Sequence, residues 1–237
     1  MKILGIDAAT KAAGVAIADE TGVLAENWLN NGKTHSQSLL PLLDSLLKNA
    51  NIPWADIQGI AVTIGPGSFT GLRIGLATVQ GLAQVLDLPV AGVVTLDALA
   101  ENLPGVPNLI CPILDARKNE VYTAMYRYEA GRMTRLSPYQ AVTPEKLVTE
   151  LLVLKEKVTF LGDGVPVYQE FILDRMKEKA VFAPASHNLL HGAQVALLGL
   201  SKFQRGQETS IFEIKPFYLR PSEAEVKWVK THGEVCL

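Results

Sequence analysis

A short glycine-rich segment constrains the fold of this chain more than any other feature. The apolar run 60–64 ends in Gly65-Pro66-Gly67-Ser68-Phe69-Thr70-Gly71, and a long helical pattern continues to residue 86. This order predicts a strand, a glycine turn and a helix, because glycine allows backbone angles and close approaches that side chains block. Ser68 and Thr70 are suited to cap the first amides of the helix. A helix that begins in this way can hold a phosphate.

The helix predicted to follow this turn is apolar on most of its faces. Arg73, Gln80 and Gln84 form its one thin polar stripe. One sheet cannot cover such a helix, so either a second layer of the same domain or another protein must cover the remainder. The sequence leaves these two alternatives open.

Composition limits the classes of function. The chain has 237 residues, 48% of them hydrophobic and 19% charged, and is large enough for one big domain or two lobes. Its formal net charge of -2 argues against a broad electrostatic surface for nucleic acid or an anionic membrane. Any contact with RNA is therefore expected to be shared with a partner.

The cysteines and the first residues of the chain indicate the cellular compartment. Cys111 and Cys236 have no zinc spacing and suit a reduced cytosol. Asp7 interrupts the stretch in which a signal peptide needs apolar residues, and no apolar run approaches the roughly 20 residues of a membrane span. We therefore expect a cytoplasmic protein that does not interact with membranes.

The first part of the chain predicts a meander. Strands at 3–7 and 14–18 flank the turn 8–13, and residues 23–29 can supply a third strand. Asp7 then lies at the first bend. A helix follows, with Pro41 in its first turn and a wide arc of leucines: Leu39, Leu40, Leu42, Leu43, Leu46 and Leu47.

The second half repeats the opening pattern. The strand that ends in Asp115-Ala116, with its return strand 121–126, resembles the strand that ends in Asp7-Ala8, and the two aspartates are 108 residues apart. Residues 103–108 are rich in turn-forming residues and are the best candidate for a hinge between the two halves. We therefore predict an α/β fold of two duplicated lobes, residues 1–104 and 105–237, with a tail that can return to the first lobe. The second lobe is expected to continue with helices at 144–154, 167–176 and 189–204 and a strand at 158–161.

The Asp hairpin, the duplication and the hinge resemble the fold of actin, the sugar kinases and the Hsp70 ATPase domain. A narrower resemblance is carried by residues 65–75, together with Ile6-Asp7-Ala8-Ala9-Thr10, the segment 35–41 and Tyr218-Leu219-Arg220-Pro221. This combination resembles the bacterial TsaB (YeaZ) family over nearly the whole chain. The eleven-residue glycine segment is its most specific part.

The resemblance implies a function in tRNA modification. It implies a non-catalytic partner or activator of TsaD, the paralogue that carries the transfer chemistry, in the complex that forms threonylcarbamoyladenosine beside the anticodon of tRNAs reading codons that begin with adenine. Expected partners are a TsaD-like paralogue and a TsaE-like ATPase, with tRNA contacted only through the complex. A homodimer is expected when the paralogue is absent.

One position separates this chain from TsaD. TsaD-like chains have a His-x-x-x-His pair on their first long helix, which places two imidazoles on one face to hold a metal. Here Leu39 stands four residues after His35. We therefore expect no catalytic metal and no cofactor, and no transfer chemistry by this chain alone.

Other residues are candidates for a site. Asp7 and the turn Gly162-Asp163-Gly164 are candidate nucleotide contacts, although both fit plain turns. His187 and His191 have helical spacing but lack a third ligand, so a helix start is the favoured interpretation. Ser68 lacks the spacing of a nucleophile elbow and is favoured as a cap.

The two N-terminal helices are predicted to form the partner interface. A strip of small residues on the second helix and a ridge of leucines on the first would meet the partner, while Arg73 either pairs with a partner carboxylate or is only solvated. The predicted interface comprises Leu39, Leu43, Leu46, Gly71, Leu72, Arg73, Gly75, Leu76, Thr78 and Val79. The alternative function is an ATPase or peptidase of the actin and sugar-kinase type.

Overall fold

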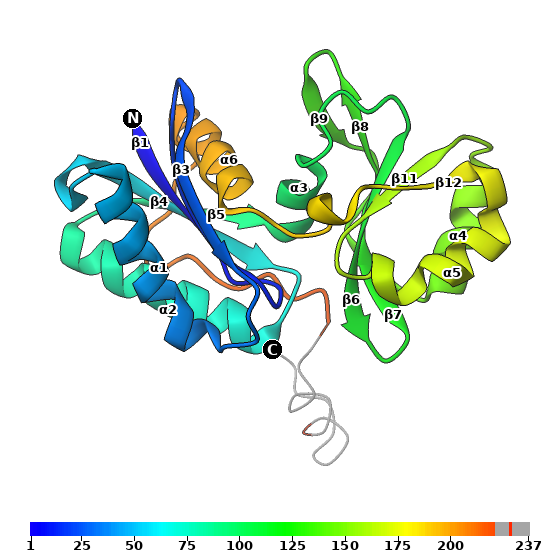
Figure 1. Ribbon diagram of the computed structural model, residues 1–237, viewed down its shortest axis with the longest axis horizontal. Coiled ribbons are helices and arrows are strands. Elements are labelled where there is room, and N and C mark those ends of the chain that lie inside the picture. Colours follow the sequence, from blue (N-terminus) through cyan, green and yellow to red (C-terminus); the bar gives the residue numbers. More distant parts are fainter. Residues whose placement is uncertain (221–227, 229–237) are drawn as a thin grey trace.

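The computed structural model describes residues 1–220 and residue 228, which form two lobes joined near the middle of the molecule (Figure 1). The first lobe is built on a five-stranded sheet. Its strands are β1 Lys2–Asp7, β2 Ala13–Asp19, β3 Gly22–Leu29, β4 Ile57–Gly65 and β5 Val90–Val94. Their order across the sheet is β3-β2-β1-β4-β5, in which β1, β4 and β5 are parallel and β2 and β3 are antiparallel.

Helices cover both faces of this sheet (Figure 1). They are α1 His35–Ala50, α2 Phe69–Leu86, α3 Thr95–Ala100 and α6 Gly192–Gln204. Side chains alternate along β1, so that Leu4 and Ile6 pack with α1 and α2 while Ile3 lies in the core on the opposite face. Gly5 faces α6, because a Cβ at Gly5 would overlap the backbone of Ala196.

The second lobe is built on a seven-stranded sheet and two helices. The strands are β6 Leu109–Arg117, β7 Glu120–Thr123, β8 Tyr126–Glu129, β9 Arg132–Arg135, β10 Gln140–Val142, β11 Val158–Leu161 and β12 Ala180–Phe182, and the helices are α4 Pro144–Val153 and α5 Val165–Met176. Three 3-10 turns complete the described elements: η1 Trp54–Asp56, η2 Lys177–Lys179 and η3 Ala185–His187.

The two sheets share one topology. Setting aside the β8–β9 hairpin, the second sheet has the order β10-β7-β6-β11-β12. If the five strands of each lobe are numbered in chain order, both sheets therefore have the same spatial order: third, second, first, fourth, fifth. The predicted two-lobed duplicated α/β fold is confirmed, with the strand of Asp115 in the second lobe equivalent to the strand of Asp7 in the first.

The last helix of the second lobe packs on the first lobe. α6, which follows the strands of the second lobe, packs on β1, β2 and β4, and α3, which contacts β4 and β5 of its own lobe, also packs on β6. A buried apolar cluster runs through this junction and contains Ile3, Leu96, Ile110, Leu161 and Leu200. Apolar contacts thus place α6 on the first lobe, although the sequence assigned it to the second lobe of residues 105–237. Ile214, in the tail that was expected to be able to return, lies in the core of the first lobe.

Local sequence rules fail at two further points. Pro41 was expected in the first turn of its helix, but α1 begins at His35 and contains Pro41 in its interior. Burial of leucines on both sides, including Leu39 and Leu43, favours one continuous helix and outweighs the poor helical preference of proline. The strands β8, β9, β10 and β12 were not predicted, since none of these runs of three or four residues has the fully buried apolar pattern of β11.

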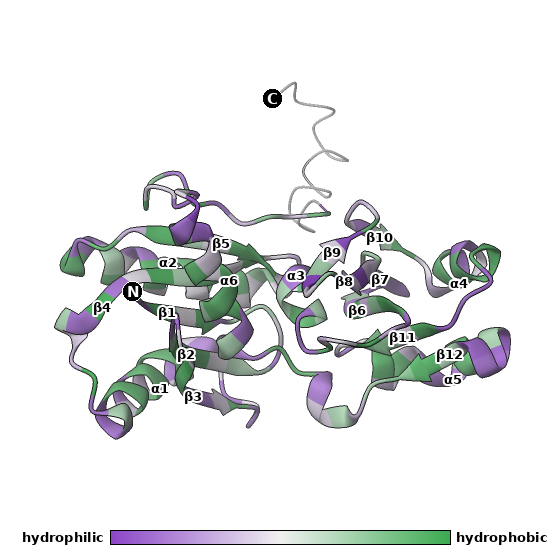
Figure 2. Ribbon diagram, turned by 90° about the horizontal axis from the view of Figure 1, so that it is seen from above, coloured by the Kyte–Doolittle hydropathy of each residue, from purple (hydrophilic) through white to green (hydrophobic). Residues whose placement is uncertain are grey.

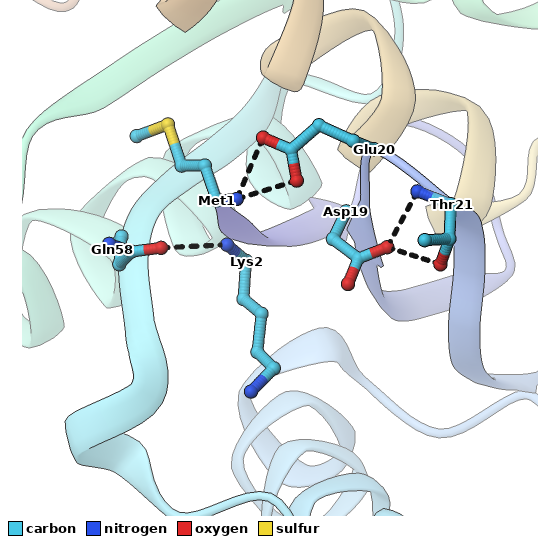
Figure 3. Close-up of polar contacts among 6 residues, drawn as sticks. All are labelled: Met1, Lys2, Asp19, Glu20, Thr21 and Gln58. Atoms are coloured by element: carbon cyan, nitrogen blue, oxygen red, sulfur yellow. Dashed lines mark hydrogen bonds and ion pairs between the residues drawn. The ribbon is translucent and has the colours of Figure 1, made fainter.

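The chain start is fixed to the first sheet (Figure 3). The Met1 ammonium group donates to both carboxylate oxygens of Glu20 at 2.7 and 2.6 Å, and the Lys2 amide donates to Gln58 Oε1 at 3.0 Å. Asp19 Oδ1 accepts from the amide of Thr21 at 2.8 Å and from its hydroxyl at 2.6 Å, which closes the turn between β2 and β3.

Apolar residues follow the sheets and the helices that cover them, as seen on β11, β12 and α2 in Figure 2. No helix within the described part of the chain is long and apolar enough to cross a membrane.

Two glycines of α2 give opposite expectations for the same substitution. A Cβ at Gly71 would overlap the carbonyl oxygen of Ala8, whereas a Cβ at Gly81 would meet nothing within 4 Å. We expect Gly81→Ala to stabilise the protein by about 0.5–1 kcal/mol through helix preference, and Gly71→Ala to destabilise it by roughly 1–3 kcal/mol through overpacking. Urea unfolding of both variants measures this, and equal effects would contradict the packing of α2 on the β1–β2 turn.

Candidate functional site

The β1–β2 turn packs directly on the beginning of α2. The Ser68 amide donates to the carbonyl of Ala9 at 2.7 Å, and Cβ atoms at Gly67 and Gly71 would overlap carbonyl oxygens of Ala9 and Ala8. The Ser68 hydroxyl accepts from the Gly71 amide at 3.2 Å, so the predicted cap is confirmed. These glycines are therefore required by backbone contacts within the chain.

Asp7 is held beneath this turn and is fully buried. Its Oδ1 accepts from the Ala9 amide and from the Thr63 hydroxyl, both at 2.9 Å, while Oδ2 has no partner among the described residues. Burial raises the pKa of Asp7 to about 7, although these hydrogen bonds act in the opposite direction. The structure thus holds a carboxyl group that can gain or lose a proton near neutral pH, with one oxygen free to accept a hydrogen bond.

The second lobe brings two more carboxylates to the same region. Asp163 Oδ1 accepts from the Asp115 amide at 3.0 Å, and burial raises the pKa of Asp163. The negative charge of Asp163 also contributes to the raised pKa of Asp7, so the two groups interact across the lobes. We call Asp7, Asp115 and Asp163 the interlobe carboxylates. The positive charge of Lys11, from the β1–β2 turn, favours the ionised form of Asp163.

The glycines beside Asp163 have a structural role. Gly162 has φ of +111°, and a Cβ there would overlap the carbonyl oxygen of Ile113. The Gly164 amide donates to the same carbonyl at 3.0 Å, and the Gly162 amide donates to Asn188 Oδ1 at 3.1 Å. The turn therefore fixes Asp163 against β6. A nucleotide contact at Asp7, Gly162, Asp163 and Gly164 stays a prediction.

The two histidines near α6 both contact Ser186, and His191 also contacts Glu26. His191 Nδ1 lies 3.4 Å from Glu26 Oε2, and this hydrogen bond raises the pKa of His191. His187 Nδ1 lies 3.0 Å from the Ser186 hydroxyl. Within residues 1–220 and at residue 228, no group of three or more His, Cys, Asp or Glu side chains is placed to hold a metal ion.

The predicted interface residues lie mostly inside the first lobe. The leucine ridge packs with Leu76 and Val79 of α2 in the core that also holds Ile6, Val15 and Ile60. Gly75 faces inward too, since a Cβ there would stand 3.1 Å from the Ala8 Cβ. The buried members are Leu39, Leu43, Leu46, Gly71, Leu72, Gly75, Leu76 and Val79.

The expectation that this strip and ridge form an open apolar surface on the free chain is therefore wrong. The first lobe itself supplies the second covering layer, one of the two alternatives that the sequence left open. Arg73 is exposed and Thr78 is partly buried. Docking of a partner through α1 and α2 stays a prediction.

Sequence reasoning missed several contacts around the beginning of α2. Thr63 bonds to Asp7, and Tyr218 stacks on Phe69 with ring centroids 3.9 Å apart. The Arg73 Nε donates to the Tyr218 hydroxyl at 3.1 Å, so Arg73 is neither simply solvated nor free to pair elsewhere without losing this bond. Residues 145 positions apart in sequence meet here, and no local pattern could indicate that contact.

The buried Asp7 carboxyl predicts a specific pH dependence of stability. Below its ordinary pKa of 3.8 the folded and unfolded states are both protonated; between 3.8 and about 7 only the folded state keeps the proton, so stability falls as pH rises. Above about pH 7 both states are ionised, and the free-energy cost of burying the Asp7 carboxylate no longer changes with pH. Asp7→Asn should therefore gain stability relative to wild type from pH 4 to 8, on the order of 4 kcal/mol.

Denaturant unfolding at several pH values measures this gain. Asp44→Asn is the matched control, because Asp44 is an aspartate with a side chain 63% exposed on the surface of α1. A difference between Asp7→Asn and wild type that stays constant across this pH range would show that Asp7 does not keep its proton in the folded chain.

Known proteins match the chain over nearly its full length. The sequence model of the family described as TsaD, tRNA N6-adenosine threonylcarbamoyltransferase, matches residues 22–228. The "tRNA threonylcarbamoyladenosine biosynthesis protein TsaB" of Bacillus subtilis (strain 168) is 36% identical over 234 residues, which are 98% of this chain and 99% of the relative. The protein of the same name from Escherichia coli (strain K12) is 30% identical over 99% of this chain and 100% of its own length.

Solved structures agree with this match. YeaZ from Pseudomonas aeruginosa is 28% identical, with a TM-score of 0.75 over 92% of this chain and 99% of that one. Component A of the (R)-2-hydroxyglutaryl-CoA dehydratase of Acidaminococcus fermentans is 13% identical with a TM-score of 0.50, over 85% of this chain and 98% of that one, and shares the fold alone. With the duplicated topology and the glycine turn packed on the Asp hairpin, these matches show that the chain belongs to the TsaB (YeaZ) family, within the wider TsaD family.

Proposed function

We propose that this chain is the non-catalytic partner and activator of a TsaD-like subunit. The complex would form threonylcarbamoyladenosine next to the anticodon of tRNAs that read codons beginning with adenine, and would include a TsaE-like ATPase. Membership of the TsaB family and the names of the Bacillus and Escherichia relatives support the pathway. The place of Leu39 supports the non-catalytic role.

Leu39 stands where a TsaD-like chain has the second histidine of its metal pair. Its side chain is 1% exposed and packs in the core beneath α1. The remaining imidazole has a structural partner, because His35 Nε2 lies 2.8 Å from the carbonyl oxygen of Thr10 and holds the β1–β2 turn. Both positions of the pair thus serve the fold of this chain, which favours a subunit whose partner supplies the metal chemistry.

The outer sides of α1 and α2 are the docking surface we propose. On α2 the exposed stripe contains Arg73, Ala77, Gly81 and Val85, of which Val85 is 84% exposed. On α1, Leu40 is 54% exposed. Small side chains in this stripe allow a second helix to approach, and the apolar ones lose contact with water on docking. A homodimer would use the same surface when the paralogue is absent, so homodimer and heterodimer would compete.

Reconstitution tests the role in tRNA modification. We expect no threonylcarbamoyladenosine and negligible ATP turnover with the purified chain and tRNA, and formation of the modified base once the TsaD-like and TsaE-like subunits and activated substrate are added. Omitting this chain should lower the rate. Transfer by this chain without the TsaD-like subunit would refute the proposal, and ATP turnover by the pure chain would favour the ATPase alternative. Nucleosides from digested tRNA are measured by mass spectrometry.

A charge in the α2 stripe tests the docking surface. Gly75→Arg would disturb the core beneath α2, whereas Ala77 is exposed, so Ala77→Arg should leave the chain folded and abolish detectable binding of both the partner and a second copy. Val153→Arg, at a position 74% exposed on α4 of the other lobe, is the matched control and should bind normally. Calorimetric titration and sedimentation measure the two assemblies. Normal binding by Ala77→Arg would place the interface elsewhere.

A further inference from the structure

The segment after α6 returns along the whole first lobe. The Thr209 amide donates to the carbonyl of Val90 at 2.8 Å, at the edge of the sheet, and Gln80 Nε2 of α2 donates to the Ile211 carbonyl at 3.0 Å. Ile214 is buried in the core beneath α1 and α2. Figures 1 and 2 show this segment, in orange in Figure 1, running past α2 toward the gap between the lobes.

The first glycine of the conspicuous turn is explained by this segment. The Phe217 amide donates to the Ile64 carbonyl at 2.7 Å. Gly65 has φ of +124°, and a Cβ there would overlap the Phe217 carbonyl oxygen. Glycine at position 65 therefore admits a second piece of backbone to the end of β4, which a side chain would exclude.

The same segment forms part of the surface at the beginning of α2. The rings of Tyr218 and Phe69 are nearly parallel, with an angle of 6° between their planes. Arg73 Cζ lies 4.9 Å from the centroid of the Phe69 ring while its Nε holds the Tyr218 hydroxyl. The three side chains make one stack, so the exposed face at the helix start depends on where the segment lies.

The end of the segment reaches the second lobe. The Phe217 ring meets the Tyr139 ring edge to face, with centroids 5.5 Å apart. Arg220 Nη1 forms an ion pair with Glu120 Oε2 at the start of β7, and lies 3.5 Å from the Ala116 carbonyl oxygen. Both charged side chains are about one third exposed, which leaves the pair accessible to competition.

We propose that residues 205–220 are a latch that couples the relative position of the two lobes to the surface that the beginning of α2 presents to a partner. The chain crosses between lobes at two covalent connections, residues 101–108 and 183–191. The buried apolar junction and the hydrogen bonds from Tyr126 and Tyr139 to Asp97 of α3 also join the lobes, and the latch adds one ion pair and one aromatic contact. Because backbone hydrogen bonds fix residues 209 and 217 to the first lobe, a shift of the second lobe pulls on the Tyr218 stack. The effect on partner binding rests on the proposed function.

Hydrogen exchange of the full chain, followed by mass spectrometry, tests the latch without a partner. Glu120→Arg places like charges together and should speed exchange several-fold in residues 208–220 and 64–72, and Glu120→Arg with Arg220→Glu should restore the wild-type rate. Glu129→Arg, at an exposed acidic residue of the same lobe, should leave both segments unchanged. If Glu120→Arg exchanges its amide hydrogens at the wild-type rate, the latch proposal is wrong. It is also wrong if the double variant Glu120→Arg with Arg220→Glu does not restore protection.

Binding of a TsaD-like partner tests the coupling. Glu120→Arg should bind the partner several-fold more weakly than wild type, and the double variant Glu120→Arg with Arg220→Glu should regain wild-type affinity. If exchange rises in Glu120→Arg while partner affinity equals that of wild type, the coupling is wrong although the segment does open. If wild type itself does not bind the partner, the proposed function fails, while the exchange data still decide whether residues 205–220 connect the lobes.

Discussion

Close backbone packing between the β1–β2 turn and the start of α2 is the contact on which the first lobe depends. Gly67 and Gly71 have no side chains at the positions where the carbonyls of Ala8 and Ala9 approach, and the Ser68 amide uses one of those carbonyls as its acceptor. This packing encloses Asp7 and brings His35 to Thr10. A few residues thus hold a turn, two helices and a buried carboxyl group in place, and there is no room for a side chain at Gly67 or Gly71.

The local part of this arrangement could be predicted from sequence. The run 60–64, the cap at Ser68 and the helical pattern to residue 86 depend on neighbours in the chain, and the structure has β4, the cap and α2 in those places. The duplication was visible too, since an apolar strand ending in Asp-Ala occurs twice. These signals come from residues a few positions apart, where backbone preference and periodicity act directly.

The direction in which apolar and small residues point could not be predicted. A strip such as Gly71 and Gly75 suits a close helix from a partner as well as a close turn from the same chain, and the choice was made by Ala8, far away in sequence. Leu39 and Leu43 show the same ambiguity, because a buried face and a docking face have one pattern. The place of α6 and the Tyr218 stack depend on contacts between residues that are far apart in the chain.

The packing of α6 on the sheet of the first lobe sets the order in which a nascent chain can finish folding. β1, β2 and β4 leave the ribosome early, but the helix that covers their second face, α6, begins only at Gly192. Until then Ile3 and Ala61 lack the cover that α6 gives them, and apolar sheet surface is exposed to other chains. The second lobe has all its strands and its own two helices once residue 182 has emerged, so the half made last is the first that can close.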